Sequence, residues 1–347
     1  MGSYFQYKVK SLFPAYFAMV MTTGILSVDL YLLGWPILPE VLLGFNIIVY
    51  LVLWLMTFTR LVRYFPRFQS DLSSHHKGAG FFTLVAGTCV LGSEILMITG
   101  NVVIPFILWI IAIFLWVVVM YTFFTFITIR QEKPSLAEGI NGAWLIAAVG
   151  TQAVSVLGTS LAPSMGDMKE IVLFFTLCMY FLGCMLYLNI MTLIFYRFTF
   201  LKLDFEAITP PYWINMGAVA ITTLAGATLI LNVDQSSLLM ELEAFVKGFT
   251  IFFWIAGTWW IPLLFILGFY RHIVHRFPFT YDPQYWAMAF PLAMYTAGTW
   301  QLSKALQLDF LEVIPQGMIY IAILVYLAVL YGFFHHLFTD YRQFKKS

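Results

Sequence analysis

The chain has 347 residues, of which 61% are hydrophobic and only 10% are charged, and its mean hydropathy is +0.87. Soluble domains carry about 25% charged residues, so this composition excludes a soluble protein and indicates an integral membrane protein. The net charge of +1 and the lack of a basic run exclude nucleic acid as a partner and leave the lipid bilayer.

Ten apolar stretches are long enough to cross a bilayer, which needs roughly 20 apolar residues per helix. They predict an all-α integral membrane protein with a single transmembrane domain over residues 1–347. They recur too far along the chain to be a removable leader, and the connections are too short for a soluble domain. The expected spans are about 12–34, 38–60, 79–99, 101–129, 138–160, 168–198, 211–231, 242–270, 284–305 and 314–338.

The ten stretches alternate in composition. Odd-numbered spans are rich in Gly, Ala, Ser and Thr, as in 142–151, and such residues let neighbouring helices approach closely. Even-numbered spans are packed with Phe, Trp, Leu and Ile, as in 108–117, and suit a surface that faces lipid. The alternation predicts five helical hairpins, in which an inner ring of odd helices surrounds a central pore and the even helices form an outer ring.

The basic residues between the spans indicate the orientation. All of the 18 lysines and arginines fall on one side of the predicted topology except Lys169, Lys247 and Lys304. Because Lys and Arg are retained on the cytoplasmic side, both termini are expected in the cytoplasm. We therefore expect a multi-pass protein of the plasma membrane.

The odd helices offer neutral hydrogen-bonding groups and exposed backbone for a path across the membrane. A lining of hydroxyls without fixed charge binds an anion weakly enough to release it, as conduction requires. The alternative for each residue is that it serves only tight helix packing. The candidates for the pore lining are Thr22, Thr23, Gly24, Thr88, Gly150, Thr151, Gly217, Thr222 and Thr296.

Two ionisable residues in or near the spans are functional candidates. Glu94 is an acid well inside the third span, where a carboxylate is costly unless it is protonated, paired or hydrated. It could carry a proton alongside an anion, or it could lie in a wet vestibule or bond between helices. Lys304, near the outer end of the ninth span, could attract anions or simply extend toward the interface.

Histidines and cysteines do not form a catalytic or metal-binding pattern in this sequence. His272 and His275 have helical spacing but no carboxylate or thiolate neighbour, and no histidine lies in mid-membrane, where a haem-binding bundle would need one. The three cysteines are unpaired by spacing and are expected to be buried thiols. We expect no metal, no cofactor and no enzymatic activity.

Three stretches resemble one family of transport proteins. These are Tyr285 to Ala293 (YWAMAFPLA), Phe17 to Leu26 (FAMVMTTGIL) and Pro210 to Gly217 (PPYWINMG). They are similar to the ninth, first and seventh helices of the family that joins plant slow-type anion channels, bacterial tellurite-resistance proteins and yeast malate and sulfite transporters. The resemblance extends over the whole chain.

This resemblance implies a homotrimer in which each subunit has five hairpins around its own pore. It also implies that the aromatic residue before the helix 9 proline, here Phe290 before Pro291, closes the pore in mid-membrane. The bulk of Phe290 suits such a gate, and Pro291 removes a helix hydrogen bond and allows a kink. Thr22 stands where the dicarboxylate-transporter branch of the family usually has Gly.

The sequence therefore supports three hypotheses. The first is an anion channel or transporter for chloride, nitrate, sulfite or C4-dicarboxylates, gated by Phe290. The second is a proton-coupled C4-dicarboxylate carrier in which Glu94 titrates. The third is an intramembrane enzyme or haem protein, which the residues support least.

Overall fold

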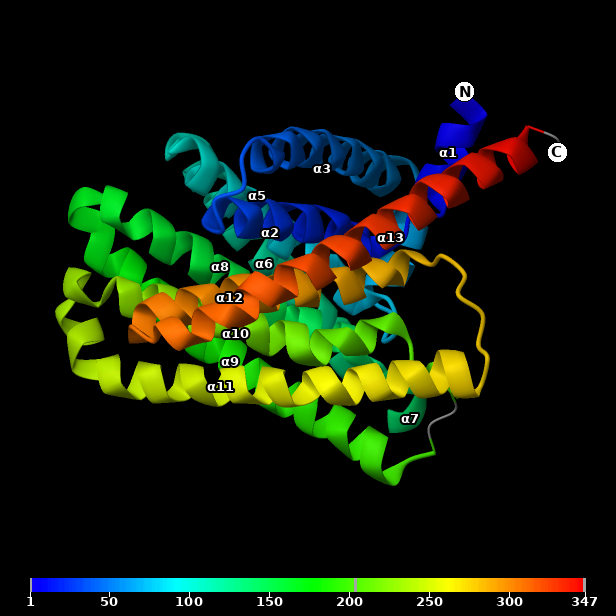
Figure 1. Cartoon of the computed structure of the whole chain (residues 1–347). Helices are drawn as coiled ribbons and strands as arrows, with labels where there is room; N and C mark the ends of the chain where they lie inside the picture. The colour runs from blue at the N-terminus through cyan, green and yellow to red at the C-terminus, as the bar shows by residue number, and fades with distance from the viewer. Residues whose placement is uncertain (1, 203–204, 346–347) are drawn as a thin grey trace.

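The computed structural model describes residues 2–202 and 205–345, which contain helices and no β-strand. The prediction of an all-α integral membrane protein is confirmed. Within the described residues, nine helical stretches are long and apolar enough to span a membrane. Figure 1 shows a bundle of roughly parallel and antiparallel helices, and both termini lie at the same end of it.

Apart from the short helices α1, α4 and α7, shorter and longer helices alternate along the chain. The α-helices are α1 (Gly2–Lys10), α2 (Ala18–Leu32), α3 (Leu38–Arg63), α4 (Phe65–Leu72), α5 (Phe82–Thr99), α6 (Val103–Ile129), α7 (Leu136–Gly139), α8 (Ile146–Leu161), α9 (Lys169–Phe200), α10 (Ile214–Leu231), α11 (Ser237–Phe269), α12 (Trp286–Leu306) and α13 (Val313–Phe344). The short helices α1 and α4 were not expected from the sequence, and α13 continues beyond its predicted end at residue 338.

The predicted span 284–305 corresponds to α12, which is a helix of 21 residues. It is not among the nine apolar stretches of the described chain. Its sequence includes Trp300, Gln301 and Lys304, which lower the mean hydropathy of its second half. Most of α12 is nevertheless buried, because other helices rather than lipid surround it.

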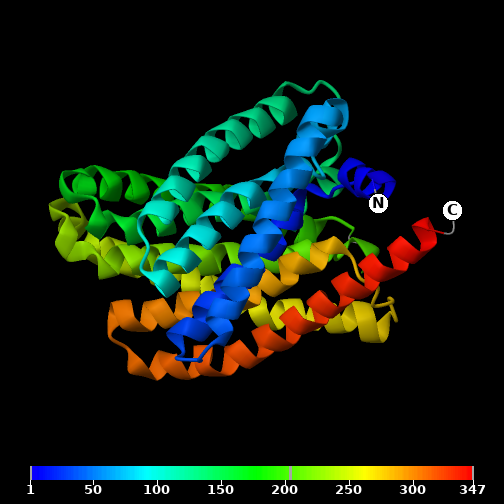
Figure 2. The same cartoon turned by 90° about the horizontal axis from the view of Figure 1, so that it is seen from above.

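Five helices lie at the centre of the bundle, and five longer ones cover them. The contacts of the central set run from α2 to α5, α8, α10 and α12, and α12 packs back against α2. In the most apolar stretch of α8 and of α10, 94% of the residues are buried, against 22% in α11 and α13. Seen from above, α3 crosses the near side of the bundle and α13 runs along one edge of it (Figure 2).

Each central helix begins with a 3-10 turn, at the end of the bundle where the termini lie. Proline occupies the first turn in three cases, because its fixed φ angle suits a helix start and its missing N–H costs nothing there. In a fourth case the side chain of Asn141 caps the turn by accepting a bond from the backbone N–H of Ala143. The turns are η1 (Pro14–Phe17), η2 (Gly78–Phe81), η3 (Gly142–Leu145), η7 (Pro210–Trp213) and η10 (Pro283–Tyr285).

An aromatic side chain of each covering helix forms a hydrogen bond to a central helix. The hydroxyl of Tyr50 on α3 lies 3.1 Å from Oγ1 of Thr88 on α5, and the indole N–H of Trp116 on α6 donates to Thr151 on α8. The same pattern recurs around the bundle. The other contacts are Tyr187 of α9 with the Asn215 carbonyl of α10, Trp254 of α11 with Thr299 of α12, and Tyr326 of α13 with Thr23 of α2.

Helices α10 and α12 share the most extensive contact between helices of the described chain, and glycine permits it. A Cβ atom at Gly217 would lie 2.6 Å from Cγ of Pro291, and one at Gly298 would lie 2.7 Å from the carbonyl oxygen of Ala220. Any side chain at either position would separate the two helices. The glycines of α10 and α12 therefore fix the position of Pro291, and with it the position of Phe290.

Candidate functional site

Two cavities lie end to end within the cycle of central helices. The wide cavity has a volume of about 830 Å³ and is lined by the 3-10 turns and first helical turns of the central helices. The narrow cavity has a volume of about 240 Å³ and is lined by the second half of the same five helices. Together they mark one axis through the protein, and the wide cavity lies at the end that holds the termini.

The two cavities are separated by about one turn of helix. Met21 and Phe290 line the wide cavity, while Ile25 and Met294, four residues further along the same helices, line the narrow one. Four residues of α-helix span about 6 Å. The same spacing holds for Val149 and Ala153 on α8. The barrier between the cavities is therefore thin.

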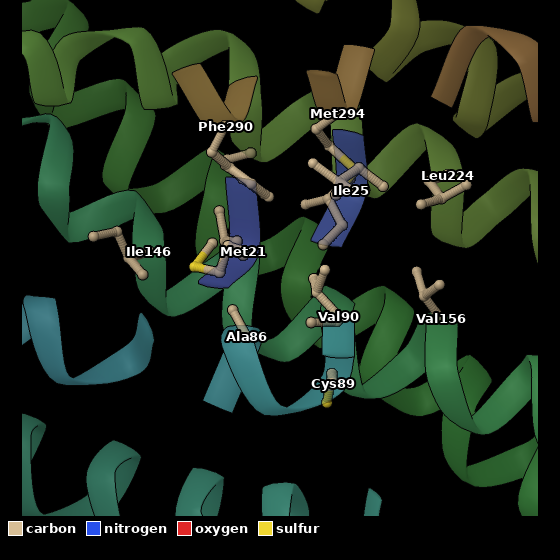
Figure 3. Packing of buried hydrophobic residues seen from close by; sticks show 14 of the residues in the cluster. Met21, Ile25, Ala86, Cys89, Val90, Ile146, Val156, Leu224, Phe290 and Met294 are labelled. Carbon is tan, nitrogen blue, oxygen red and sulfur yellow. The ribbon is translucent and has the colours of Figure 1, made fainter. Parts of the chain in front are cut away.

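Apolar side chains form this barrier. Figure 3 shows Phe290, Met21 and Ala86 in one column with Ile146 to its side, Met294, Ile25, Val90 and Cys89 in the next, and Val156 and Leu224 further along. Phe290 and Met21 are each only 2% exposed, so among the described residues these two side chains pack closely between the cavities. A constriction lined only by apolar groups blocks ions because water does not fill it.

Charged residues occur at the wide cavity but not at the narrow one. Among its described lining residues, the wide cavity has Lys77, Arg197 and Lys202 against one acid, Glu138. The lining of the narrow cavity includes Ser93, Ser160, Thr228, Asn232 and Gln301 and no charged residue among those described. The wide cavity is therefore a positively charged vestibule, and the narrow cavity is neutral.

Arg197 is held in place by the loops that lead into the central helices. It is 8% exposed, and its guanidinium donates to the carbonyl oxygen of Ile140 and to the hydroxyl of Tyr212. Lys77 lies 3.2 Å from Asp71, which also pairs with Arg60. Burial, with the charge of Arg130 nearby, lowers the pKa of His75 next to the vestibule and so favours its neutral form. The positive charge comes from lysine and arginine.

The comparisons with known proteins agree with this architecture. Residues 11–334 match the family described as voltage-dependent anion channel. The chain belongs to this family.

Relatives of the chain include two transporters and a membrane protein. An uncharacterized transporter of Methanocaldococcus jannaschii is 27% identical over 320 residues, which cover 89% of each chain. A second uncharacterized transporter of that organism is 25% identical over 93% of this chain and 94% of its own. An uncharacterized membrane protein of Mycobacterium tuberculosis is 35% identical over 152 residues, or 44% of this chain and 77% of its own.

In this member of the anion channel family, the predicted pore-lining residues line neither cavity. The hydroxyls of five predicted threonines donate to the backbone carbonyl four residues earlier, at 2.7 to 3.1 Å. These are Thr22, Thr88, Thr151, Thr222 and Thr296. The remaining threonine, Thr23, bonds to Tyr326 of α13. Thr22, Thr23, Thr88 and Thr151 also bond to a neighbouring helix, as the packing alternative describes.

The predicted glycines also lie at close contacts between helices. A Cβ atom at Gly150 would lie 3.3 Å from the carbonyl oxygen of Phe82, and one at Gly24 would lie 2.8 Å from Cγ1 of Val90. Gly217, as described above, faces Pro291. Of the predicted site residues only Phe290 lines a cavity. Alanine, valine, isoleucine and methionine of the same helices supply much of the lining.

Glu94 lies away from both cavities. Its Oε2 accepts a hydrogen bond of 2.7 Å from Nδ2 of Asn46 on α3, and its side chain is fully buried. Gly24 on α2 leaves room for this pair, since a Cβ atom there would lie 3.1 Å from Oε2 of Glu94. Glu94 therefore joins α5 to α3 behind the lining residues Val90 and Ser93.

Lys304 is neutralised by a neighbouring acid. Its ammonium group pairs with Glu312 and lies 4.5 Å from the ring centre of Trp300. It lines neither cavity. Within the described residues no group of three or more His, Cys, Asp and Glu side chains is placed to hold a metal ion.

The basic residues of the vestibule were not singled out in the sequence. Lys77, Arg197 and Lys202 served there only to assign the orientation of the helices. Lys77 comes from the connection before α5, whereas Arg197 and Lys202 lie in and just after the last turn of α9. Only the folded bundle brings the two regions to one cavity. Their shared position on one side of the membrane was the signal that could have indicated a positively charged mouth.

Proposed function

We propose that this protein moves small anions across the plasma membrane through the axis that the two cavities mark. The observation that carries the proposal is the pair of cavities within the closed set of central helices, separated by one apolar turn. A positive vestibule raises the local concentration of anions and repels cations. The narrow cavity has no charged residue among its described lining, so it does not bind an anion too tightly to release it.

Phe290 is the gate in this proposal. It lines the wide cavity at its deepest level, and Met294 one turn further lines the narrow cavity. Phe290 and Met21 thus occupy the axis where the two cavities would otherwise join. Pro291 leaves the carbonyl of Ala287 without its usual helix partner, which makes this part of α12 easier to bend. Rotation of the Phe290 ring or bending of α12 would open the path.

The proposed cargo is a small monovalent anion, sulfite or a C4-dicarboxylate. The wide cavity falls in the usual range for small-molecule sites, about 300–1,000 Å³, and so admits all of them. The narrow cavity is smaller and neutral, and it favours small anions such as chloride and nitrate. The resemblance to tellurite-resistance and dicarboxylate-transport proteins keeps the larger anions in the set.

Flux from proteoliposomes tests the proposal. The purified protein is reconstituted, and efflux of chloride, nitrate, sulfite and malate is measured with and without a pH gradient. We expect flux of at least one of these anions that exceeds the flux through protein-free vesicles and does not require the gradient. Lack of flux for all four anions, with the protein shown to be folded and inserted, would contradict the proposal.

The second candidate is a proton-coupled C4-dicarboxylate carrier. Its supporting observation is the burial of Glu94 in a membrane helix, where a carboxylate is by default a functional residue. Malate uptake that requires an inward proton gradient would favour this candidate. The position of Glu94 behind the lining, bonded to Asn46, favours the channel instead.

A homotrimer with both termini in the cytoplasm completes the proposal. The two termini lie at the same end of the bundle, which suits an even number of membrane crossings. The basic residues of the connections gather at that end, as retention of Lys and Arg in the cytoplasm requires. Cross-linking of the purified protein measures the number of subunits, and labelling of single cysteines added near Gly2 or Lys345 from either side of the membrane measures the orientation.

A further inference from the structure

A third cavity lies outside the central helices, and the proposed anion path does not use it. This lateral groove has a volume of about 770 Å³ and is formed by α1, α3, α13 and the start of α2. Its base includes Tyr16 and Met19, close to the end of the bundle that holds the termini. Figure 1 shows α1 beside the C-terminal part of α13. Residues of both helices line one end of the groove.

The walls of the lateral groove are apolar over most of their length. Ile48 and Val52 of α3 face Phe334 and Leu337 of α13 across it, and each of these four side chains is at least 36% exposed. Side chains on a membrane helix that are exposed in this way contact hydrocarbon. Here they line a concave cavity of ligand size rather than a flat surface. Such a cavity fits an acyl chain.

Polar and charged groups gather at one end of the lateral groove. Tyr4, Lys8, His336, Asp340 and Tyr341 line it there. Lys8 pairs with Asp340, and the hydroxyl of Tyr4 donates to the same carboxylate at 3.3 Å. This ion pair docks α1 on α13, and tyrosines are the residues that proteins place at the level of lipid head groups.

The charge around this end is positive. Helix α1 contains Lys8 and Lys10 and no acid, and the end of α13 adds Arg342 next to the single acid Asp340. Clusters of basic residues just outside the hydrocarbon region on the cytoplasmic side attract anionic lipid head groups. An apolar cavity that ends in such a cluster matches the chemistry of an anionic phospholipid from tail to head.

We propose that the lateral groove is a binding site for one anionic phospholipid, with an acyl chain between α3 and α13 and the head group at Lys8. The lipid would also contact the wall of the anion vestibule. Phe13 and Pro283 line both the groove and the wide cavity, and Pro283 opens the turn that leads into α12. The site does not depend on which anion the protein carries.

Native mass spectrometry of the full chain in detergent tests this site. Phosphatidylglycerol or phosphatidylcholine is added, and the lipid molecules retained on each subunit are counted. We expect preferential retention of phosphatidylglycerol. Val52→Trp fills the groove and is expected to lose the retained lipid, whereas Leu51→Trp, on the lipid-facing side of the same helix turn, is expected to keep it.

The head-group contact has its own variants. Lys8→Gln is expected to weaken retention of phosphatidylglycerol about fivefold while leaving phosphatidylcholine unchanged, since one basic residue near the surface contributes about that factor. Lys8→Arg should restore the retention, and Lys133→Gln, in an exposed loop outside the groove, serves as the control. Equal lipid retention by Val52→Trp and Leu51→Trp would contradict the proposed site. A change in the number of subunits in Val52→Trp would contradict it as well, because the groove would then be a contact between copies of the chain. The readout is bound mass, so its failure leaves the proposed transport activity standing.

Discussion

The wide and narrow cavities are built from the same five helices but differ in size and charge. The wide one has about 830 Å³ and several basic residues, and the narrow one has about 240 Å³ and none among its described lining. The difference arises because the wide cavity is formed at the helix starts, where loops and the ends of the covering helices contribute Lys77, Arg197 and Lys202. The narrow cavity is formed by the central helices alone. In the proposed function, charge at one mouth collects anions, and the apolar turn between the cavities controls their passage.

Removing the barrier between the cavities should have the largest effect. Phe290→Ala joins the two cavities and is expected to raise anion flux by about tenfold or more, equivalent to a barrier lower by about 1.4 kcal/mol. Flux from proteoliposomes measures it. Phe252→Ala, at an exposed position of α11, is the control for a lost phenylalanine. Equal flux in wild type and a folded Phe290→Ala variant would show that the ring does not close the axis.

Displacing α12 should disturb the barrier indirectly. Gly217→Ala places a Cβ atom 2.6 Å from Pro291 and is expected to cost about 1–3 kcal/mol through overpacking. Its thermal unfolding midpoint in detergent should fall and its flux should change. Gly44→Ala is the matched control, because no atom lies within 4 Å of the added methyl group there. An unchanged midpoint for Gly217→Ala would mean that α10 and α12 are not held together at this point.

The charge difference between the cavities can be tested at Lys202. Lys202→Gln is expected to lower anion flux about two- to threefold at low salt, since one exposed charge in water contributes less than about 1 kcal/mol. The effect should vanish at high salt because of screening. Lys133→Gln, which is exposed and lines neither cavity, should leave flux unchanged. A loss of flux in Lys202→Gln that persists at high salt would point to a structural role instead.

The smallest effect is expected at Glu94. Because its side chain lies behind the lining and bonds to Asn46, Glu94→Gln should leave anion flux the same within error, with or without a pH gradient. The isosteric amide can still accept the bond from Asn46. Malate uptake that follows the pH gradient in wild type but not in Glu94→Gln would establish the proton-coupled carrier and give the acid a role on the path.

Much of the architecture could be predicted from the sequence. The apolar stretches gave an all-α membrane protein, and the contrast between 142–151 and 108–117 matches the buried α8 and the more exposed α6. Phe290 was identified through the family resemblance and lines the wide cavity, while its role as a gate stays a prediction. The stretch 284–305 was predicted as a span from its length, and the structure has the helix α12 there, although α12 is not among the nine apolar stretches of the described chain.

The rotation of the central helices was decided only by the tertiary structure. The threonines of α2, α5 and α8 belong to the predicted helices, but they turn outward to Tyr326, Tyr50 and Trp116. A stretch in which apolar and hydroxyl residues surround the whole helix has no periodicity that shows which face points to the axis. Hydrogen bonds from the aromatic residues of the covering helices, far away in the sequence, set that face.

The sequence by itself therefore determined the helical class, the membrane location and the division into helices rich in small residues and helices rich in bulky ones. These properties depend on the composition of each segment. The folded bundle decided which side chains line the cavities and where the charges gather. Arg197 lies at the end of α9 and reaches Ile140 and Tyr212 across two other connections. Such contacts join segments that are distant along the chain, and only the packing of the helices brings them together.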